Sequence, residues 1–222
     1  MTADQKKEIA LKINNILFKG YLNSTDTFDV TSNAYGFYSE ILKEENVTDE
    51  QKALIALNLV DGSVATPDRK QKAEVDVFKS YKDYFGESWK DVNLSAISYC
   101  PRYSYNSSEK VFYADSACGG TTSMEVITHI DNFQIDNDIA VADLYVVVTV
   151  PKTEDVNGDR YVTNELAPLV DNVNKNLVID TVPAGSSYKI TDANKDRANK
   201  YRFTFKKAED GTFYYYSVKN NK

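Results

Sequence analysis

The sequence has little of several features that mark common protein classes. Its 222 residues contain two cysteines, one histidine and one tryptophan. No apolar stretch approaches the roughly 20 residues that a membrane-spanning helix needs, and no run of basic residues exceeds two. The formal charge of −7 argues against a nucleic-acid partner, because such binding needs a surface rich in lysine and arginine. These absences predict a globular chain with neither a membrane span nor a nucleic-acid site.

The first residues are polar and lead directly into a predicted helix, so Met1 does not begin a recognisable secretory signal. If the protein works outside the cytoplasm, we expect its export signal or membrane anchor to be absent from this chain. The membrane would then be contacted only through that missing anchor.

The two cysteines bracket a predicted β-hairpin. Tyr103, Tyr105 and Tyr113 favour strands, and residues 106–109 favour a turn. Folding of this hairpin brings Cys118 near Cys100, and a bridge would close a loop of roughly 17 residues, stabilising the fold by about 3 kcal/mol. Since disulfides persist in oxidising compartments, a bridge predicts an extracytoplasmic location. The alternative is a pair of reduced cysteines in a core, compatible with the cytoplasm.

Residues 1–86 are predicted to be helical. Thr2 with Gln5 and Thr48 with Gln51 form capping boxes ahead of apolar stripes, and Thr66 followed by a proline predicts the start of a further helix. A less regular helix is expected within residues 33–45.

Residues 87–222 are predicted to be rich in strands. Alternating patterns cover residues 94–105, 110–115, 123–130, 139–150, 201–207 and 212–219, with shorter strands expected at 177–180 and 188–191. Residues 140–150 are the most apolar and predict a central strand covered on both faces. Helices followed by strands indicate an α+β fold, in which N-terminal helices pack on a curved, mainly antiparallel sheet formed by the C-terminal two-thirds of a single domain, 1–222.

The last predicted hairpin offers a candidate binding surface. Strict alternation places Phe203 and Phe205 on one face with Tyr214 and Tyr216, and this face is expected to be core. Phe213 and Tyr215 then lie on the other face, and they are either covered by a helix or exposed as a contact surface.

Several segments resemble a family of uncharacterised proteins. These are Tyr35-Gly-Phe-Tyr38, Thr48 to Leu57, Cys100 to Cys118-Gly-Gly-Thr121, and Tyr201-Arg-Phe-Thr-Phe-Lys-Lys with Asp210-Gly-Thr-Phe-Tyr-Tyr-Tyr-Ser-Val218. The family comprises extracytoplasmic proteins of low-GC Gram-positive bacteria, usually with an N-terminal membrane anchor. The resemblance implies a location at the extracellular side of the membrane and no particular activity. The helix-on-sheet arrangement is also similar to cystatin-like and nuclear-transport-factor-like folds, by analogy of fold alone.

Catalytic and metal-binding patterns are sparse. His129, the only histidine, is expected to be a satisfied or surface residue, and no Gly-x-Ser-x-Gly elbow accompanies it. Cys118 with His129 as base is the alternative, although a bond to Cys100 would remove the thiolate. Two Asp-x-Asn-x-Asp loops, at 155–159 and 192–196, lack the later ligands of a calcium loop. We therefore expect no catalytic residue, metal or cofactor.

Three classes of function stay open. The first is a non-enzymatic cell-surface interaction module that contacts an unknown protein or envelope component. The second is a small-ligand-binding domain with a pocket between helices and sheet. The third is a hydrolase that uses carboxylates, for which a buried carboxylate pair with shifted pKa values would be the sign.

Overall fold

The computed structural model describes residues 1–20, 26–32, 36–66, 69–96, 101–115, 124–153 and 157–221. It has the predicted α+β architecture, with helices in the N-terminal part and mainly antiparallel strands in the C-terminal two-thirds. The α-helices in the described residues are α1 (Ala3–Leu17), α2 (Tyr38–Glu44), α3 (Asp49–Leu59) and α4 (Glu74–Phe85), with 3-10 turns η1 (Leu94–Ala96), η2 (Lys175–Leu177) and η3 (Lys195–Arg197).

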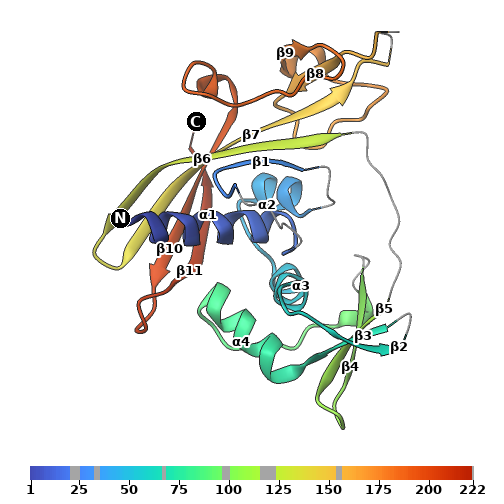
Figure 1. The fold of residues 1–222 in the computed structure, drawn as a ribbon, viewed down its shortest axis with the longest axis vertical. Helices are drawn as coiled ribbons and strands as arrows, with labels where there is room; N and C mark the ends of the chain where they lie inside the picture. The colour runs from blue at the N-terminus through green and yellow to red at the C-terminus, as the bar shows by residue number, and fades with distance from the viewer. Residues whose placement is uncertain are drawn as a thin grey trace.

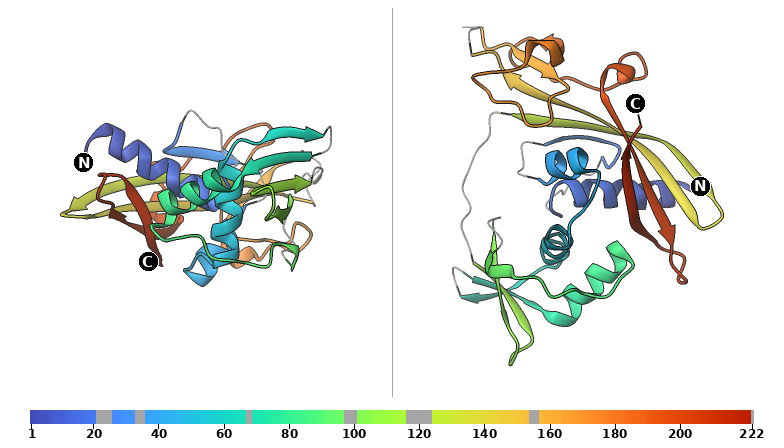
Figure 2. Two further views of the ribbon diagram at one scale, coloured as in Figure 1. Left: turned by 90° about the horizontal axis from the view of Figure 1, so that it is seen from below. Right: turned by 180° about the vertical axis from the view of Figure 1, so that it is seen from behind.

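A large antiparallel sheet forms one layer of the molecule. Its strand order is β1-β6-β7-β10-β11, and β8 and β9 extend it from the far end of β7. Figures 1 and 2 show α1 lying along the inner face of this sheet. The strands are β1 (Asp29–Ser32), β6 (Glu125–Asp136), β7 (Ile139–Pro151), β8 (Arg160–Thr163), β9 (Val178–Val182), β10 (Asn199–Lys207) and β11 (Phe213–Asn220).

A small antiparallel sheet lies at the end of the molecule opposite β8 and β9 (Figure 1). Its order is β2-β3-β5-β4, with β2 (Ser63–Thr66), β3 (Arg69–Ala73), β4 (Arg102–Asn106) and β5 (Val111–Asp115). The β4–β5 hairpin confirms the strand pair predicted between the two cysteines. The small sheet and the large sheet contribute side chains to one hydrophobic cluster.

Local signals predicted two helix starts correctly and one incorrectly. The capping boxes at Thr2 and Thr48 are both formed, with the threonine hydroxyl accepting the N–H of the glutamine three residues later. The helix expected between Thr66 and Gly86 exists as α4 (Glu74–Phe85), but its predicted start is wrong, because residues 63–66 and 69–73 are strands. Pairing of β3 with β5 holds this segment extended, and α4 begins only at Glu74.

The strand predictions hold for the long central elements and fail for some short ones. β7 pairs with both β6 and β10, which confirms the central strand. The beginning of the strand expected at 94–105 is the 3-10 turn η1, and residues 188–191 are irregular. Strands β1 and β8 were not predicted, since each has only four residues and depends on pairing with a longer neighbour.

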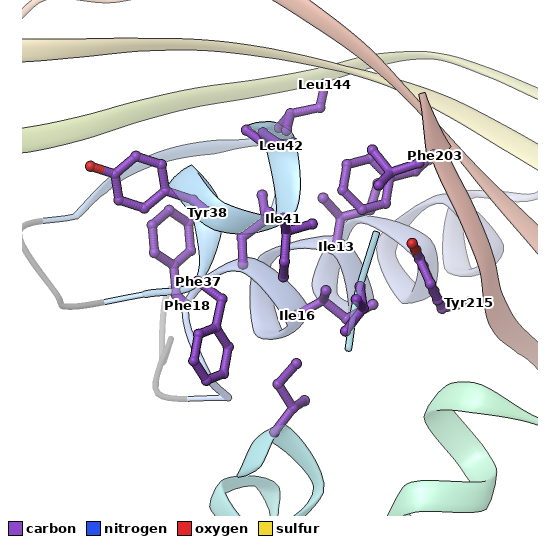
Figure 3. Packing of buried hydrophobic residues seen from close by; sticks show 14 of the residues in the cluster. Ile13, Ile16, Phe18, Phe37, Tyr38, Ile41, Leu42, Leu144, Phe203 and Tyr215 are labelled. Carbon is purple, nitrogen blue, oxygen red and sulfur yellow. The ribbon is translucent and has the colours of Figure 1, made fainter. Parts of the chain in front are cut away.

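The main core fills the space between the helices and the large sheet. Figure 3 shows Ile13 and Ile16 of α1 and Ile41 of α2 in one cluster with Leu144 of β7 and Phe203 of β10. Leu144, Phe203 and the three isoleucines are fully buried, and the other buried residues of this cluster expose at most 8% of their surface. Packed side chains therefore fill the space between the helices and the sheet, where the ligand-binding alternative predicted a pocket.

A buried lysine joins the small sheet to α3. Lys72 of β3 is 7% exposed and donates to the Leu57 carbonyl, 2.5 Å from Nζ. Burial, with a smaller contribution from the charge of Lys70, lowers the pKa of Lys72 to about 8. Nearby, the Tyr103 hydroxyl donates to Asn58 Oδ1 at 2.5 Å.

This lowered pKa predicts a pH-dependent stability. Above about pH 8 the folded protein has begun to lose the Lys72 proton, while the unfolded chain keeps it to about pH 10. Because the unfolded state then binds more protons, the free energy of unfolding should rise with pH by about 2 kcal/mol between pH 8 and 10, relative to Lys72→Met. Urea denaturation of both proteins across this range measures the difference. Parallel pH profiles would contradict it, and Lys79→Met at an exposed lysine is the control.

Candidate functional site

The candidate surface formed by Phe213 and Tyr215 is buried, which corrects the predicted facing of the last hairpin. Phe213 is 0% and Tyr215 7% exposed, whereas Tyr216 is 55% exposed. A β-bulge explains the reversal: Thr204 pairs with Ser217 and Phe205 with Tyr215, so Tyr216 has no partner in the register. The extra residue shifts the alternation and turns Phe213 and Tyr215 inward, where Phe85 of α4 packs on Tyr215.

Cys100 and Cys118 lie outside the described residues, so their bond stays a prediction. We expect non-reduced, purified protein to show no free thiol by mass spectrometry after alkylation. A serine at either position should lower the Tm without abolishing the fold, since a chain of this size has its own core. Two alkylated thiols in unreduced material would contradict the bridge.

His129 is a satisfied residue of β6, as expected. Its Nδ1 lies 2.6 Å from Asp29 Oδ1 of β1, and its side chain is 21% exposed. The pair links the edge strand β1 to β6 on the outer face of the large sheet. Its proposed catalytic partner Cys118 is not among the described residues.

A polar network lies on the same outer face, centred on a buried carboxylate. Asp143 of β7 is 1% exposed and accepts two hydrogen bonds from Arg202, Nε to Oδ1 at 2.8 Å and Nη2 to Oδ2 at 3.1 Å. Lys200 Nζ lies 3.2 Å from Asp143 Oδ2. Asn132 donates both to Asp143 and to the Tyr145 hydroxyl. One carboxylate therefore holds two cations and an amide.

The pKa values in this network are shifted away from those of a proton-transfer catalyst. Burial by itself would raise the pKa of Asp143, but hydrogen bonds and charges from Arg202 and Lys200 outweigh it and lower the pKa. Lys195 of η3 lies beside this network and pairs with Asp131 of β6 at 3.0 Å, and its hydrogen bonds to Asp192 and then Asp131 raise its pKa. A general acid or base works best with a pKa near the working pH. The network therefore fits a structural role better than the hydrolase alternative.

An aromatic cluster lies between α4 and the small sheet, at the other end of the molecule. Trp89 stacks on Phe78 with ring centroids 5.2 Å apart, and it also contacts Phe112 at 5.3 Å and Tyr81 at 5.4 Å. Tyr105 packs on Phe112 at 4.7 Å. Tyr81 and Phe112 are buried, so they anchor the outer rings.

The outer part of this cluster reaches solvent. Tyr105 is 43% exposed, Val75 is 71% exposed, and Phe78 and Trp89 are half-buried. The Tyr105 hydroxyl donates to Glu74, which fixes this ring against the first turn of α4. That hydrogen bond, then burial and the charges of Glu74 and Asp91, raise the pKa of Tyr105. We call this region the Trp89 surface, formed by Glu74, Val75, Phe78, Trp89, Asp91 and Tyr105.

The sequence reasoning missed the Trp89 surface. Its residues come from α4, from the segment that follows α4 and from β4. The local signal that could have indicated it is the spacing of the aromatic residues along α4. Only the pairing of β4 with β5 places Tyr105 beside Phe112 and thus beside Trp89.

A small cavity lies at the C-terminal end of α4, beside the β10–β11 turn. Its volume is about 110 Å³, and its lining includes Asp83, Gly86, Asp210 and Tyr214. Pockets for drug-sized ligands usually measure about 300–1,000 Å³. This cavity is therefore too small to favour the ligand-binding alternative.

The side chains of the second acidic loop, residues 192–196, form contacts within the protein. Asp192 pairs with Lys195 at 2.6 Å, and Asn194 Oδ1 accepts the Thr191 N–H. Part of the first loop lies outside the described residues. Among the residues that are described, no group of three or more histidine, cysteine or acidic side chains is placed to hold a metal ion.

Comparison of the chain with protein-family models, curated proteins and solved structures found no match. Within the described parts of the chain, none of the helices combines the length and apolar character needed to cross a membrane. The case for a function therefore depends on the surfaces of the molecule itself.

Proposed function

We propose that this chain is a non-enzymatic interaction module that contacts another protein through the Trp89 surface. The observation that carries the proposal is the half-open aromatic cluster, in which buried Tyr81 and Phe112 support Trp89 and Tyr105 at the surface. Aromatic residues that are rigidly held and partly exposed are the residues that dominate binding energy at protein interfaces.

The surroundings of the cluster support this proposal over the two alternatives. The helix–sheet interface is filled by packed side chains, which disfavours a ligand pocket in that place. The titratable groups of the polar network are stabilised in their charged forms, which disfavours proton transfer by them. A location at the extracellular side of the membrane belongs to the proposal, and the predicted Cys100–Cys118 bond and the family resemblance support it.

Photo-cross-linking in the producing cells tests the proposal. A benzoylphenylalanine in place of Val75 lies within the Trp89 surface, and the same group in place of Tyr216 is the matched control at an exposed site. We expect a discrete protein adduct from position 75 that position 216 does not form. Adding Tyr105→Ala to the position-75 variant should reduce that adduct strongly. Identical adducts from both positions, or none from position 75, would contradict the proposal.

A further inference from the structure

We infer that the partner presents lysine or arginine side chains to the Trp89 surface, so that this surface recognises a basic protein segment. The inference rests on the proposed function and names the chemistry of its partner. It depends on two independent features of the surface, its carboxylates, which form no ion pair with the described residues, and the exposed ring of Tyr105.

The carboxylates of the Trp89 surface have no cation of their own. Glu74 is half-buried and Asp91 is exposed, and neither forms an ion pair within the described part of the chain. Lys90, next to Asp91 in sequence, is instead held by Asp49 at 2.9 Å and Glu87 at 3.2 Å. The whole chain carries a charge of −7. Two carboxylates without an ion-pair partner among the described residues, on a chain of negative net charge, favour a cationic ligand over an anionic one.

Elsewhere in the molecule, aromatic rings are covered by the protein's own lysines. Lys206 Nζ lies 3.7 Å from the ring centroid of Tyr216, and Lys175 Nζ lies 3.7 Å from that of Tyr161. In the described ranges no lysine or arginine lies over Phe78, Trp89 or Tyr105. Phe78 and Trp89 are instead packed against other rings, so the ring that is open to a cation from outside is Tyr105, which is 43% exposed.

The Trp89 surface also offers apolar contacts for the methylene stem of a lysine or arginine side chain. Val75 and Phe78 lie one helical turn apart on α4 and offer apolar contact beside Glu74. A lysine or arginine can lay its methylene stem on such a surface while its charged end reaches a carboxylate. A neutral glycan would use the rings without needing Glu74 and Asp91, and an acidic partner would be repelled by them.

Binding of defined peptides to the full chain tests the inference. The probe is a fluorescein-labelled nonapeptide of alternating lysine and glycine, measured by fluorescence anisotropy at low salt. We expect saturable binding that Tyr105→Ala weakens about tenfold, as loss of one cation–π contact would. The double variant E74Q/D91N should weaken it at least as much, and higher salt should weaken it further. Tyr216→Ala should leave it unchanged.

The controls separate this inference from the proposed function. A matched peptide with glutamate in place of lysine should not bind, nor should chitotetraose, and each variant is checked by its Tm. The inference is overturned if the lysine peptide does not bind, if all variants bind it equally, or if either control ligand binds instead. If the position-75 cross-link still forms in that case, the interaction surface stands and only the basic partner is wrong. If neither the binding of the lysine peptide nor the position-75 cross-link is observed, the proposed function is wrong as well.

Discussion

Replacing Phe205 by alanine should lower the free energy of unfolding by about 3–5 kcal/mol, the usual effect of deleting a buried aromatic ring. Phe205 is 0% exposed on the inner face of β10. Tyr215→Ala should cause a loss of similar size, about 3 kcal/mol, because Tyr215 packs edge-on against Phe85, Phe203 and Phe205. Both losses are large beside the ~5–15 kcal/mol stability of a typical domain.

Tyr216 provides the matched control for this prediction. It is adjacent to Tyr215 in sequence but 55% exposed, and Lys206 lies over its ring. Tyr216→Ala should therefore lower the free energy of unfolding by at most about 1 kcal/mol, the loss of one exposed cation–π contact. Urea denaturation of the three variants gives the comparison. Equal losses for Tyr215→Ala and Tyr216→Ala would mean that the bulge in β11 is misplaced.

The second large effect should come from Asp143. Replacing it by alanine leaves the Arg202 guanidinium, the Lys200 ammonium and the Asn132 amide without their shared acceptor. Breaking a buried ion pair costs about 3–5 kcal/mol, and the lower end applies here because Arg202 is partly exposed. Asp143→Ala should thus lower the free energy of unfolding by about 3 kcal/mol, measured in urea because it does not screen ion pairs.

The contribution of Asp143 should depend on pH in a defined direction. Its pKa is lowered in the folded protein, so its stabilisation is complete above the unfolded pKa of about 4 and is lost as the pH falls through the folded value. The difference between wild type and Asp143→Ala should therefore be constant near neutral pH and shrink in acid.

Asp192→Ala serves as the comparison, since Asp192 also pairs with a lysine but its side chain is 90% exposed. A loss below about 1 kcal/mol is expected there. An equally small loss for Asp143→Ala would show that the network does not contribute as its burial indicates.

Features encoded by neighbouring residues were predictable from the sequence. The capping boxes at Thr2 and Thr48 form because each needs only a hydroxyl and a glutamine three residues apart. The central position of β7 was predictable because its continuous apolar run can only be covered on both faces. The α+β class follows from the order of these local patterns along the chain.

Features that depend on pairing between distant segments were decided only by the tertiary structure. The first turns of the helix expected from Thr66 are replaced by strands, because β3 pairs with β5, which lies about forty residues later in the chain. The bulge at Tyr216 reverses the facing of Phe213 and Tyr215, because one unpaired residue shifts the alternation of side chains between the two faces of the strand.

The candidate site shows the same division. The sequence alone showed that Trp89 is the single tryptophan. It did not place Tyr105 beside Phe112 or beside Glu74, because those contacts arise when the β4–β5 hairpin folds against α4. Local patterns thus determined which residues form helices and central strands. Long-range packing decided which aromatic rings are buried and which stay exposed, since exposure depends on what covers a residue and not on its neighbours in the chain.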